Sequence, residues 1–434
     1  MDISFLYDIF KQYPIVTTDS RNTPKNSIFF ALKGANFNGN KYAKQALQSG
    51  CSYAIVDEAE YATSSNIILV EDSLKALQQL ANYHRNTLKT PIIAITGTNG
   101  KTTTKELVTS VLGKEHKIIS TAGNYNNHIG VPLTLLQIKK DHEIAVIEMG
   151  ANHIGEIKEL CEIAEPNYGL ITNIGYAHLE GFGSYENIVK TKGELYDYIR
   201  TRKEGKLFVD YNNPVLRKIS EGITSIYYGL DNEEEQFVTG KVISANPYLT
   251  FKWKMATNYH TVETQLIGDY NLSNALAAIT IGKYFGVKGD LISKAIAEYE
   301  PNNSRSQLKE TPQNMLIVDS YNANPTSMLA ALQNFDQMQV KHKVLILGEM
   351  KELGPDSSVE HQRIIDYIQH HNFNKVFLVG ENFKPTEHQS NWKFTNFKDV
   401  NELLEYLQKN PIQDNYVLLK GSRGVQLEKA IELL

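Results

Sequence analysis

The chain has 434 residues, of which 41% are hydrophobic and 21% are charged, and its formal net charge is −5 at pH 7. This length favours two to four domains, and the acidic balance excludes the broad basic field that a nucleic acid or an acidic membrane surface would need. Two cysteines make neither a disulfide framework nor a metal knuckle, and no apolar run is long enough to cross a membrane, so membrane insertion is not expected.

The N-terminal part, residues 1–84, mixes short strands with helices. It opens with MDISFLYDIF, which lacks the basic segment of an export signal, so we expect a cytoplasmic protein. The strands SIFFAL, YAIVD and NIILV are predicted, with one helix at residues 42–49 and a second from about Ser73 to Thr87. We interpret this part as a small α/β domain.

The middle part, residues 85–301, changes character along its length. Its first half alternates helical stretches with the apolar strands IIAIT, KIIS, EIAVIEM, YGLIT and KLFVD, which favours a parallel sheet with crossover helices. From about residue 220 to 267 the strands SIYYGL, EQFVTGKVI, YLTFKWKM and HTVETQLI predict antiparallel hairpins, and a helix at residues 271–285 follows.

The C-terminal part, residues 302–434, is a second alternating block. Its strands MLIVDSY, KVLILG, KVFLVG and YVLLKG are separated by helical segments. This alternation predicts a Rossmann-like α/β domain. The whole chain is therefore expected to be an α/β protein of three domains, with a mostly parallel central sheet extended by antiparallel hairpins.

The segment PIIAITGTNGKTTTKEL, residues 91–107, is typical of a phosphate-binding loop because it follows an apolar strand and opens a helix. Its glycine spacing is two residues tighter than in the common G-x-x-x-x-G-K-[ST] pattern, whose first glycine would stand at Ile95. Lys101 would bring charge to the β- and γ-phosphates, and Thr102 would offer its hydroxyl to Mg²⁺. The expected nucleotide-binding residues are Gly97, Thr98, Asn99, Gly100, Lys101, Thr102 and Thr103.

The nucleotide is expected to be ATP. The guanine-reading N-K-x-D motif is absent, and the nearest similar segment is Asn374-Lys375-Val376-Phe377. The alternative is a plain glycine turn with an incidental lysine, which the agreement of residue types, order and flanking elements disfavours.

Polar residues follow the predicted parallel strands at the ends where open sheets bind ligands. Glu148 ends the third strand, and Asn173 and His178 follow the fourth. The amide-rich segment TAGNYNNHIG, residues 121–130, follows the second strand. A magnesium ligand and a polar cradle are the functional interpretations; a surface charge, a satisfied loop histidine and a plain turn are the alternatives that the pattern leaves open.

These segments together resemble the Mur ligase family, ATP-dependent enzymes that build the peptide of the bacterial cell-wall precursor. The resemblance covers essentially the whole chain and rests on ITGTNGKTT, EMGANHIGEI, ITNIGYAHLEGFGS, KTKGEL, GDYNLSNALAAI, VDSYNANP, LGEMKELG and LKGSRGVQLE. VDSYNANPTSM and LGEMKELG are typical of the member that joins D-Ala-D-Ala to UDP-N-acetylmuramoyl-tripeptide through an acyl phosphate. Another family member or a P-loop motor or regulator are the competing hypotheses.

The resemblance implies roles for the domains and for several residues. Residues 1–84 would bind the UDP-muramoyl substrate, residues 85–301 would bind ATP, and residues 302–434 would close on ATP and bind the dipeptide. The uridine diphosphate would lie near Ser20 and Arg21, and the muramoyl-peptide near Thr121, Asn124, Asn126 and Asn127. The resemblance also assigns adenine to Asn274, the phosphates to Arg305 and the ribose to Asp319.

The resemblance further implies that Lys192, in KTKGEL, is carbamylated by CO₂. By itself a lysine at this position is most simply a solvated charge, and Lys190 is the neighbouring candidate, but KGEL is the register that matches the family. The implied catalytic residues are Lys101, Lys192, His178 and Glu148, with Thr102, Glu148, His178 and Lys192 on two Mg²⁺ ions. The implied partners are small molecules only, and the implied state is a monomer.

Overall fold

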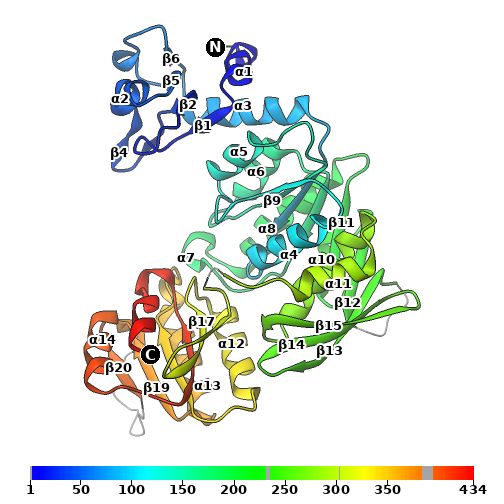
Figure 1. Ribbon diagram of the computed structural model, residues 1–434, viewed down its shortest axis with the longest axis vertical. Helices are drawn as coiled ribbons and strands as arrows, with labels where there is room; N and C mark the ends of the chain where they lie inside the picture. The colour runs from blue at the N-terminus through cyan, green and yellow to red at the C-terminus, as the bar shows by residue number, and fades with distance from the viewer. Residues whose placement is uncertain (1, 231–234, 303, 384–393) are drawn as a thin grey trace.

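The computed structural model describes residues 2–230, 235–302, 304–383 and 394–434. Figure 1 shows three α/β bodies that follow one another along the chain, coloured blue, then cyan to green, then yellow to red. Their sheets have four, nine and six strands, and no strand of one sheet pairs with a strand of another within the described residues. This arrangement confirms the three-domain α/β prediction. None of the described helices is both long and apolar enough to span a membrane.

The N-terminal sheet is entirely parallel, in the order β1-β2-β5-β6. Its strands are β1 (Ile15–Thr17), β2 (Ser27–Phe30), β5 (Tyr53–Val56) and β6 (Ile67–Leu69), and β3 (Lys33–Gly34) and β4 (Phe37–Asn38) form a small hairpin. Helix α2 (Ala43–Gln48) and helix α3 (Ser73–Thr87) match the prediction. Helix α1 (Ile3–Gln12) was not predicted. Asp2 caps it by accepting a hydrogen bond from the backbone N–H of Ser4.

Helix α3 fixes the N-terminal body to the central one. The guanidinium of Arg85, near its C-terminus, is buried and donates to the carbonyls of Ala164 and Glu165 at 2.9 and 3.0 Å. These carbonyls end helix α6 (Glu156–Ala164), whose last carbonyls have no partner within the helix. The predicted boundary between residues 84 and 85 therefore lies inside a helix that both bodies share.

The central sheet has nine strands in the order β15-β14-β13-β12-β11-β10-β7-β9-β8. The seven strands β8, β9, β7, β10, β11, β12 and β13 are all parallel to their neighbours in this group. Strand β14 pairs antiparallel with β13 and with β15. The prediction that SIYYGL belongs to a hairpin is therefore wrong, because it forms β12 between two parallel neighbours. The bounds are β7 (Ile92–Thr96), β8 (Ile118–Ser120), β9 (Ile144–Glu148), β10 (Tyr168–Ile171), β11 (Lys206–Asp210), β12 (Ser225–Leu230), β13 (Val238–Ala245), β14 (Tyr248–Met255) and β15 (Asn258–Ile267).

Helices cover both faces of this sheet, which explains why its strands are continuous apolar runs. One core joins the sheet to α4 (Lys101–Leu112), α10 (Asn271–Tyr284) and α11 (Gly289–Ala297). The opposite core contains residues of α3, α6, α5 (Gly130–Leu135), α7 (Leu179–Phe182), α8 (Tyr185–Arg200) and α9 (Pro214–Ser220). Because β9, β7 and β10 are parallel neighbours, their carboxyl ends lie together at one edge of the sheet.

The C-terminal sheet has the order β16-β17-β21-β18-β19-β20, parallel except for the edge strand β16. Its strands are β16 (Gln307–Glu310), β17 (Asn314–Asp319), β18 (Lys343–Gly348), β19 (Lys375–Val379), β20 (Thr395–Phe397) and β21 (Asn415–Lys420), and its α-helices are α12 (Pro325–Gln337), α13 (Ser357–Gln369) and α14 (Val400–Lys409). This is the predicted alternation, with β16 and β20 added to it.

Candidate active site

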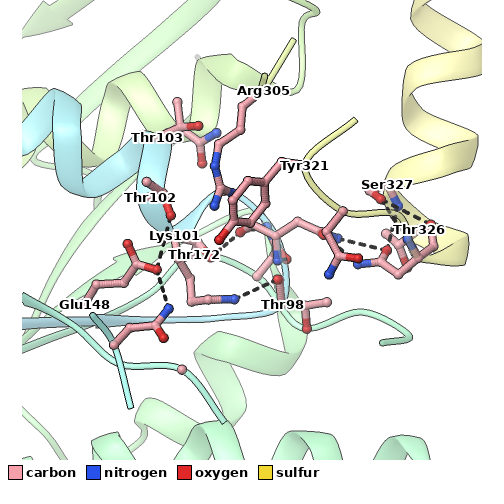
Figure 2. Close-up of a pocket in the computed structure, with 18 of the residues that line it drawn as sticks. Thr98, Lys101, Thr102, Thr103, Glu148, Thr172, Arg305, Tyr321, Thr326 and Ser327 are labelled. Atoms are coloured by element: carbon pink, nitrogen blue, oxygen red, sulfur yellow. Dashed lines mark hydrogen bonds between the residues drawn. The ribbon is translucent and has the colours of Figure 1, made fainter. Parts of the chain in front are cut away.

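A cavity of about 650 Å³ lies where the central and C-terminal bodies meet. Figure 2 shows its lining, with the phosphate loop and Glu148 on one side and Tyr321, Thr326 and Ser327 on the other. Residues Thr98 to Thr103 all line it, as do the strand-end residues Glu148, Thr172 and Asn173. The predicted ligand edge of the central sheet therefore lines a cavity, and residues of the last domain line its other side.

The phosphate loop needs both of its glycines. Gly97 has a φ of +140°, and a Cβ there would lie 2.0 Å from the hydroxyl of Thr172. Gly100 has a φ of +76° and caps α4, and a Cβ there would lie 2.6 Å from Oδ1 of Asn274. A left-handed backbone and close approach both favour glycine. The first residues of α4, Lys101 to Thr103, line the cavity, so the start of this helix lies where an anion site is expected.

Lys101 is held inside the loop rather than extended into solvent. Its Nζ donates to the carbonyls of Gly97 and Thr98 at 2.7 and 2.9 Å. Burial lowers its pKa to about 8; the charge of Arg305 acts in the same direction, and the charge of Glu148 opposes it. A phosphate anion in the cavity would restore the preference of this amine for its charged form.

Glu148 is a buried carboxylate whose second oxygen has no partner. Its Oε1 accepts from the Thr102 hydroxyl at 3.2 Å and from the Asn126 amide at 2.8 Å, whereas Oε2 is buried and unpartnered among the described residues. An orphaned carboxylate oxygen beside a threonine hydroxyl fits a hard divalent cation such as Mg²⁺. No group of three or more His, Cys, Asp or Glu side chains in the described part of the chain is placed to hold a metal ion, so phosphate oxygens and water would complete the coordination.

Lys192 lies on α8 and is only 2% exposed, whereas Lys190 is exposed. Its Nζ donates to the carbonyl of Ala151 at 3.3 Å and lies 5.4 Å from the centre of the Phe182 ring. Burial lowers the pKa of Lys192 well below its ordinary value, and the nearby Lys101 charge lowers it further. Lys192 therefore favours the neutral amine that reaction with CO₂ requires.

His178 lines the same cavity but already has a partner from the C-terminal body. It adopts a left-handed backbone conformation, with a φ of +50°, and its Nδ1 forms a short contact with the carboxylate of Glu352. This contact holds the pKa of Glu352 below its ordinary value. The role of His178 as a metal ligand stays a prediction, with Nε2 as the available nitrogen.

The amide-rich segment divides into structural and cavity-facing members. Thr121 is buried, and its hydroxyl accepts from the backbone N–H of Glu148 at 2.9 Å. Asn127 lines the cavity, and its Oδ1 also accepts from the N–H groups of Ile129 and Gly130 at the start of α5. Asn124 and Asn126 line the cavity as well, and Asn126 holds Glu148.

Three residues expected around the nucleotide line the cavity together: Asn274, Arg305 and Asp319. The amide of Asn274 accepts from the hydroxyl of Thr104 at 3.0 Å and donates to Asn271 at 2.9 Å, so it also joins α10 to α4. The guanidinium of Arg305 stacks on the Tyr321 ring, 3.7 Å from its centre, with its Nε buried and unpartnered among the described residues. Their assigned contacts with ATP stay predictions.

Two residues of the C-terminal body that were not predicted as site residues contact the central body at the cavity. Asn324 caps α12, and its Nδ2 donates to Oδ1 of Asn99 at 2.8 Å. The hydroxyl of Thr326 accepts from the backbone N–H of Tyr176 at 3.2 Å. The segment VDSYNANPTSM contains both residues, so the signal was present, but only the fold shows what they contact. The C-terminal body therefore contacts the phosphate loop through Asn324 and the segment after β10 through Thr326.

Ser20 and Arg21 lie outside this cavity. Both follow β1 at the carboxyl end of the N-terminal sheet, and Arg21 is exposed and bonded to the carboxylate of Asp19 at 2.9 and 3.0 Å. Such an edge is where parallel sheets bind ligands. Their contact with a uridine diphosphate stays a prediction.

Comparison with known proteins gives one consistent family. The Mur ligase family, catalytic domain, matches residues 12–85; the Mur ligase middle domain matches residues 95–282; and the Mur ligase, glutamate ligase domain, matches residues 304–423. The chain is 33% identical over 426 residues to the UDP-N-acetylmuramoyl-tripeptide–D-alanyl-D-alanine ligase of Bacillus subtilis, covering 96% of this chain and 92% of that one.

Solved structures agree with this match. A crystal structure of MurF from Acinetobacter baumannii superposes with a TM-score of 0.85 at 30% identity, covering 96% of this chain and 92% of that chain. MurF ligase from Thermotoga maritima in complex with ADP superposes with a TM-score of 0.84 at 25% identity, covering 98% and 97%.

Proposed function

The chain belongs to the Mur ligase family, and we propose that it is the ATP-dependent ligase that joins D-alanyl-D-alanine to UDP-N-acetylmuramoyl-tripeptide. The observation that carries this proposal is similarity at 33% identity along 96% of the chain to a ligase of that specificity. The cavity supports it independently, because a phosphate loop with its lysine, Lys101, and the orphaned carboxylate of Glu148 line one space between two domains.

The proposed reaction is an amide ligation driven by ATP. The terminal carboxylate of the tripeptide attacks the γ-phosphorus of ATP, giving an acyl phosphate and ADP. The amine of D-Ala-D-Ala then attacks that carbonyl, and the tetrahedral intermediate collapses with loss of phosphate. The nucleophile and the phosphates are both anionic, so the task of the protein is to position them and neutralise their repulsion.

Residues of this chain supply that neutralisation at defined places. Lys101 leaves the loop carbonyls for the β- and γ-phosphate oxygens, and the N–H groups at the start of α4 bind the same oxygens. Mg²⁺ bound by Glu148 and Thr102 would neutralise phosphate charge. The C-terminal body contacts the loop through Asn324 and Asn99, and it would shield the acyl phosphate from water.

Two Mg²⁺ ions and a carbamate complete the proposal. Lys192 is buried and its pKa is lowered, which favours the neutral amine and supports carbamylation. The carbamate would then bind a second Mg²⁺ ion together with His178. We further propose that residues 1–84 bind the UDP-muramoyl part, residues 85–301 bind ATP, and residues 302–434 bind the dipeptide, in a monomer.

Phosphate release by the purified protein with ATP and Mg²⁺ tests the function. The tripeptide substrate and D-Ala-D-Ala are supplied separately and together. Release that requires both, with a pentapeptide product by mass spectrometry, is the expected result. Release with the tripeptide and a different amine would replace the proposed specificity by that of another family ligase, and full release with ATP alone would indicate an ATPase of another kind.

A further inference from the structure

We propose that Lys420 is a positioning residue for the nucleotide: it holds the Asp319 carboxylate in place for a ribose hydroxyl of ATP. This inference rests on the proposed function, because it assumes that the cavity binds ATP. Lys420 contacts neither the phosphate loop nor the proposed metal ligands. It ends β21, a strand in the interior of the C-terminal sheet.

Lys420 is a cation with almost no access to bulk water. Its side chain is 2% exposed, and its Nζ donates to Oδ2 of Asp319 at 2.5 Å. The other carboxylate oxygen of Asp319, Oδ1, accepts a hydrogen bond from the backbone N–H of Ser306 at 3.3 Å. Burying a lysine is costly unless its charge is paired. The Asp319 contact therefore accounts for the cation, and the cation in turn fixes the carboxylate.

The register of the sheet makes this pair rigid. Strands β17 and β21 are parallel neighbours, and Asp319 and Lys420 are directly opposite each other at their carboxyl ends. Both side chains line the cavity. A carboxylate at this end of an α/β sheet is a usual acceptor for a ribose hydroxyl, so the pair lies at the edge where a nucleotide is expected.

The surroundings fit a polar sugar next to the pair. The hydroxyl of Tyr270, which comes from the central body, bonds to the hydroxyl of Ser306 at 2.8 Å. Tyr270 and Ser306 also line the cavity, so a chain of polar contacts runs from the central body to Asp319. Among the described residues, Lys420 donates to Asp319 alone, so its other two N–H groups are available to oxygen atoms of a ligand.

The test compares ATP with 2′-deoxy-ATP and 3′-deoxy-ATP in pentapeptide formation. A hydrogen bond to a charged group typically contributes a factor of about 10 to 100, so the wild type should prefer ATP over at least one analogue by that factor in kcat/KM. In Lys420→Met the preference should fall to about threefold or less, because the unheld carboxylate no longer selects the hydroxyl.

A purely structural role for Lys420 gives a different result. It would lower kcat/KM for ATP and for the deoxy analogues by the same factor, and the preference would stay at its wild-type value. That outcome overturns the proposal, as does a wild type that makes pentapeptide with no preference for either hydroxyl. A wild type that makes no pentapeptide from ATP would instead contradict the proposed function.

Two further variants keep the test decisive. Lys420→Gln retains a donor toward Asp319 without the charge, so it should show an intermediate preference and also serves if Lys420→Met does not fold. Lys343→Met is the matched control. Lys343 begins the neighbouring strand β18 at its amino end, and its Nζ donates to the carbonyl of Asp336. Its removal should leave the preference for ATP unchanged.

Discussion

Replacing Lys192 is the perturbation with the most specific expected outcome. Lys192→Ala should lower kcat by a factor of about 100 to 1,000, the usual cost of removing one group that stabilises charge in a transition state. ATP binding should be largely unchanged, because Lys101 and the start of α4 hold the phosphates and Lys192 is not among the residues that line the cavity.

The structure separates this loss from a loss of stability. Lys192 has one hydrogen bond of 3.3 Å and no ion pair among the described residues, so Lys192→Met, which keeps most of the volume, should change the free energy of unfolding by less than about 1.5 kcal/mol. Lys192→Ala should cost about 2 to 5 kcal/mol because it leaves a cavity. Both variants should lose turnover to a similar extent.

The assay is phosphate release with both substrates, alongside urea unfolding of each variant. Short carboxylic acids such as acetate should partly restore the turnover of Lys192→Ala, because they can replace the carbamate oxygens. Removal of dissolved CO₂ should slow the wild type, because the carbamate forms from CO₂. Lys190→Ala, two residues away and exposed, is the control. If Lys192→Ala turned over within about threefold of Lys190→Ala, the carbamate would have no place in the mechanism.

Three other predictions follow from contacts and charges. Gly175→Ala should lower kcat about tenfold with little change in ATP affinity, because a Cβ there would lie 2.8 Å from the hydroxyl of Thr326 and would push the last domain away from the central one. Gly34→Ala is the control, since the space around its Cβ is open. Small-angle scattering that shows no expansion of the Gly175 variant would contradict this reasoning. Affinity for an ATP analogue in EDTA should fall by up to tenfold per pH unit above pH 8, because the pKa of free Lys101 is about 8 and binding favours its protonated form. An affinity that is equal at pH 8 and pH 9.5 would refute this. Burial raises the pKa of Asp210, so its carboxylate opposes folding above that pKa and not below it; Asp210→Asn should therefore raise the melting temperature at pH 7 and lose this advantage as the pH falls, which calorimetry at several pH values would check.

Local sequence was sufficient where neighbouring residues decide the structure. The phosphate loop, the strand before it and the helix after it follow from glycines and an apolar run that stand next to one another in the chain. Helix α3 has the predicted bounds because Asp72 caps it by accepting from the N–H of Lys75. The alternation in the last domain likewise predicted its parallel sheet.

Pairing between strands required the tertiary structure. Only residues 231–237 separate β12 from β13, a spacing that favours a hairpin, yet the two strands run parallel. No helix is predicted in the segment MDISFLYDIF, yet Leu6, Ile9 and Phe10 form a buried helical stripe there. Strand direction and burial both depend on how segments pack in space, which local residue patterns do not specify.

Sequence motifs predicted Lys101, Glu148 and Lys192 as site residues, whereas the fold decides the environment of each. A lysine is written the same way in a sequence whether it is solvated or buried. The fold buries Lys192 and leaves Lys190 exposed, and it pairs Asp319 with Lys420 across 101 residues of chain. Burial and charge pairing depend on distances in space, and these are fixed only when separate strands and domains pack together.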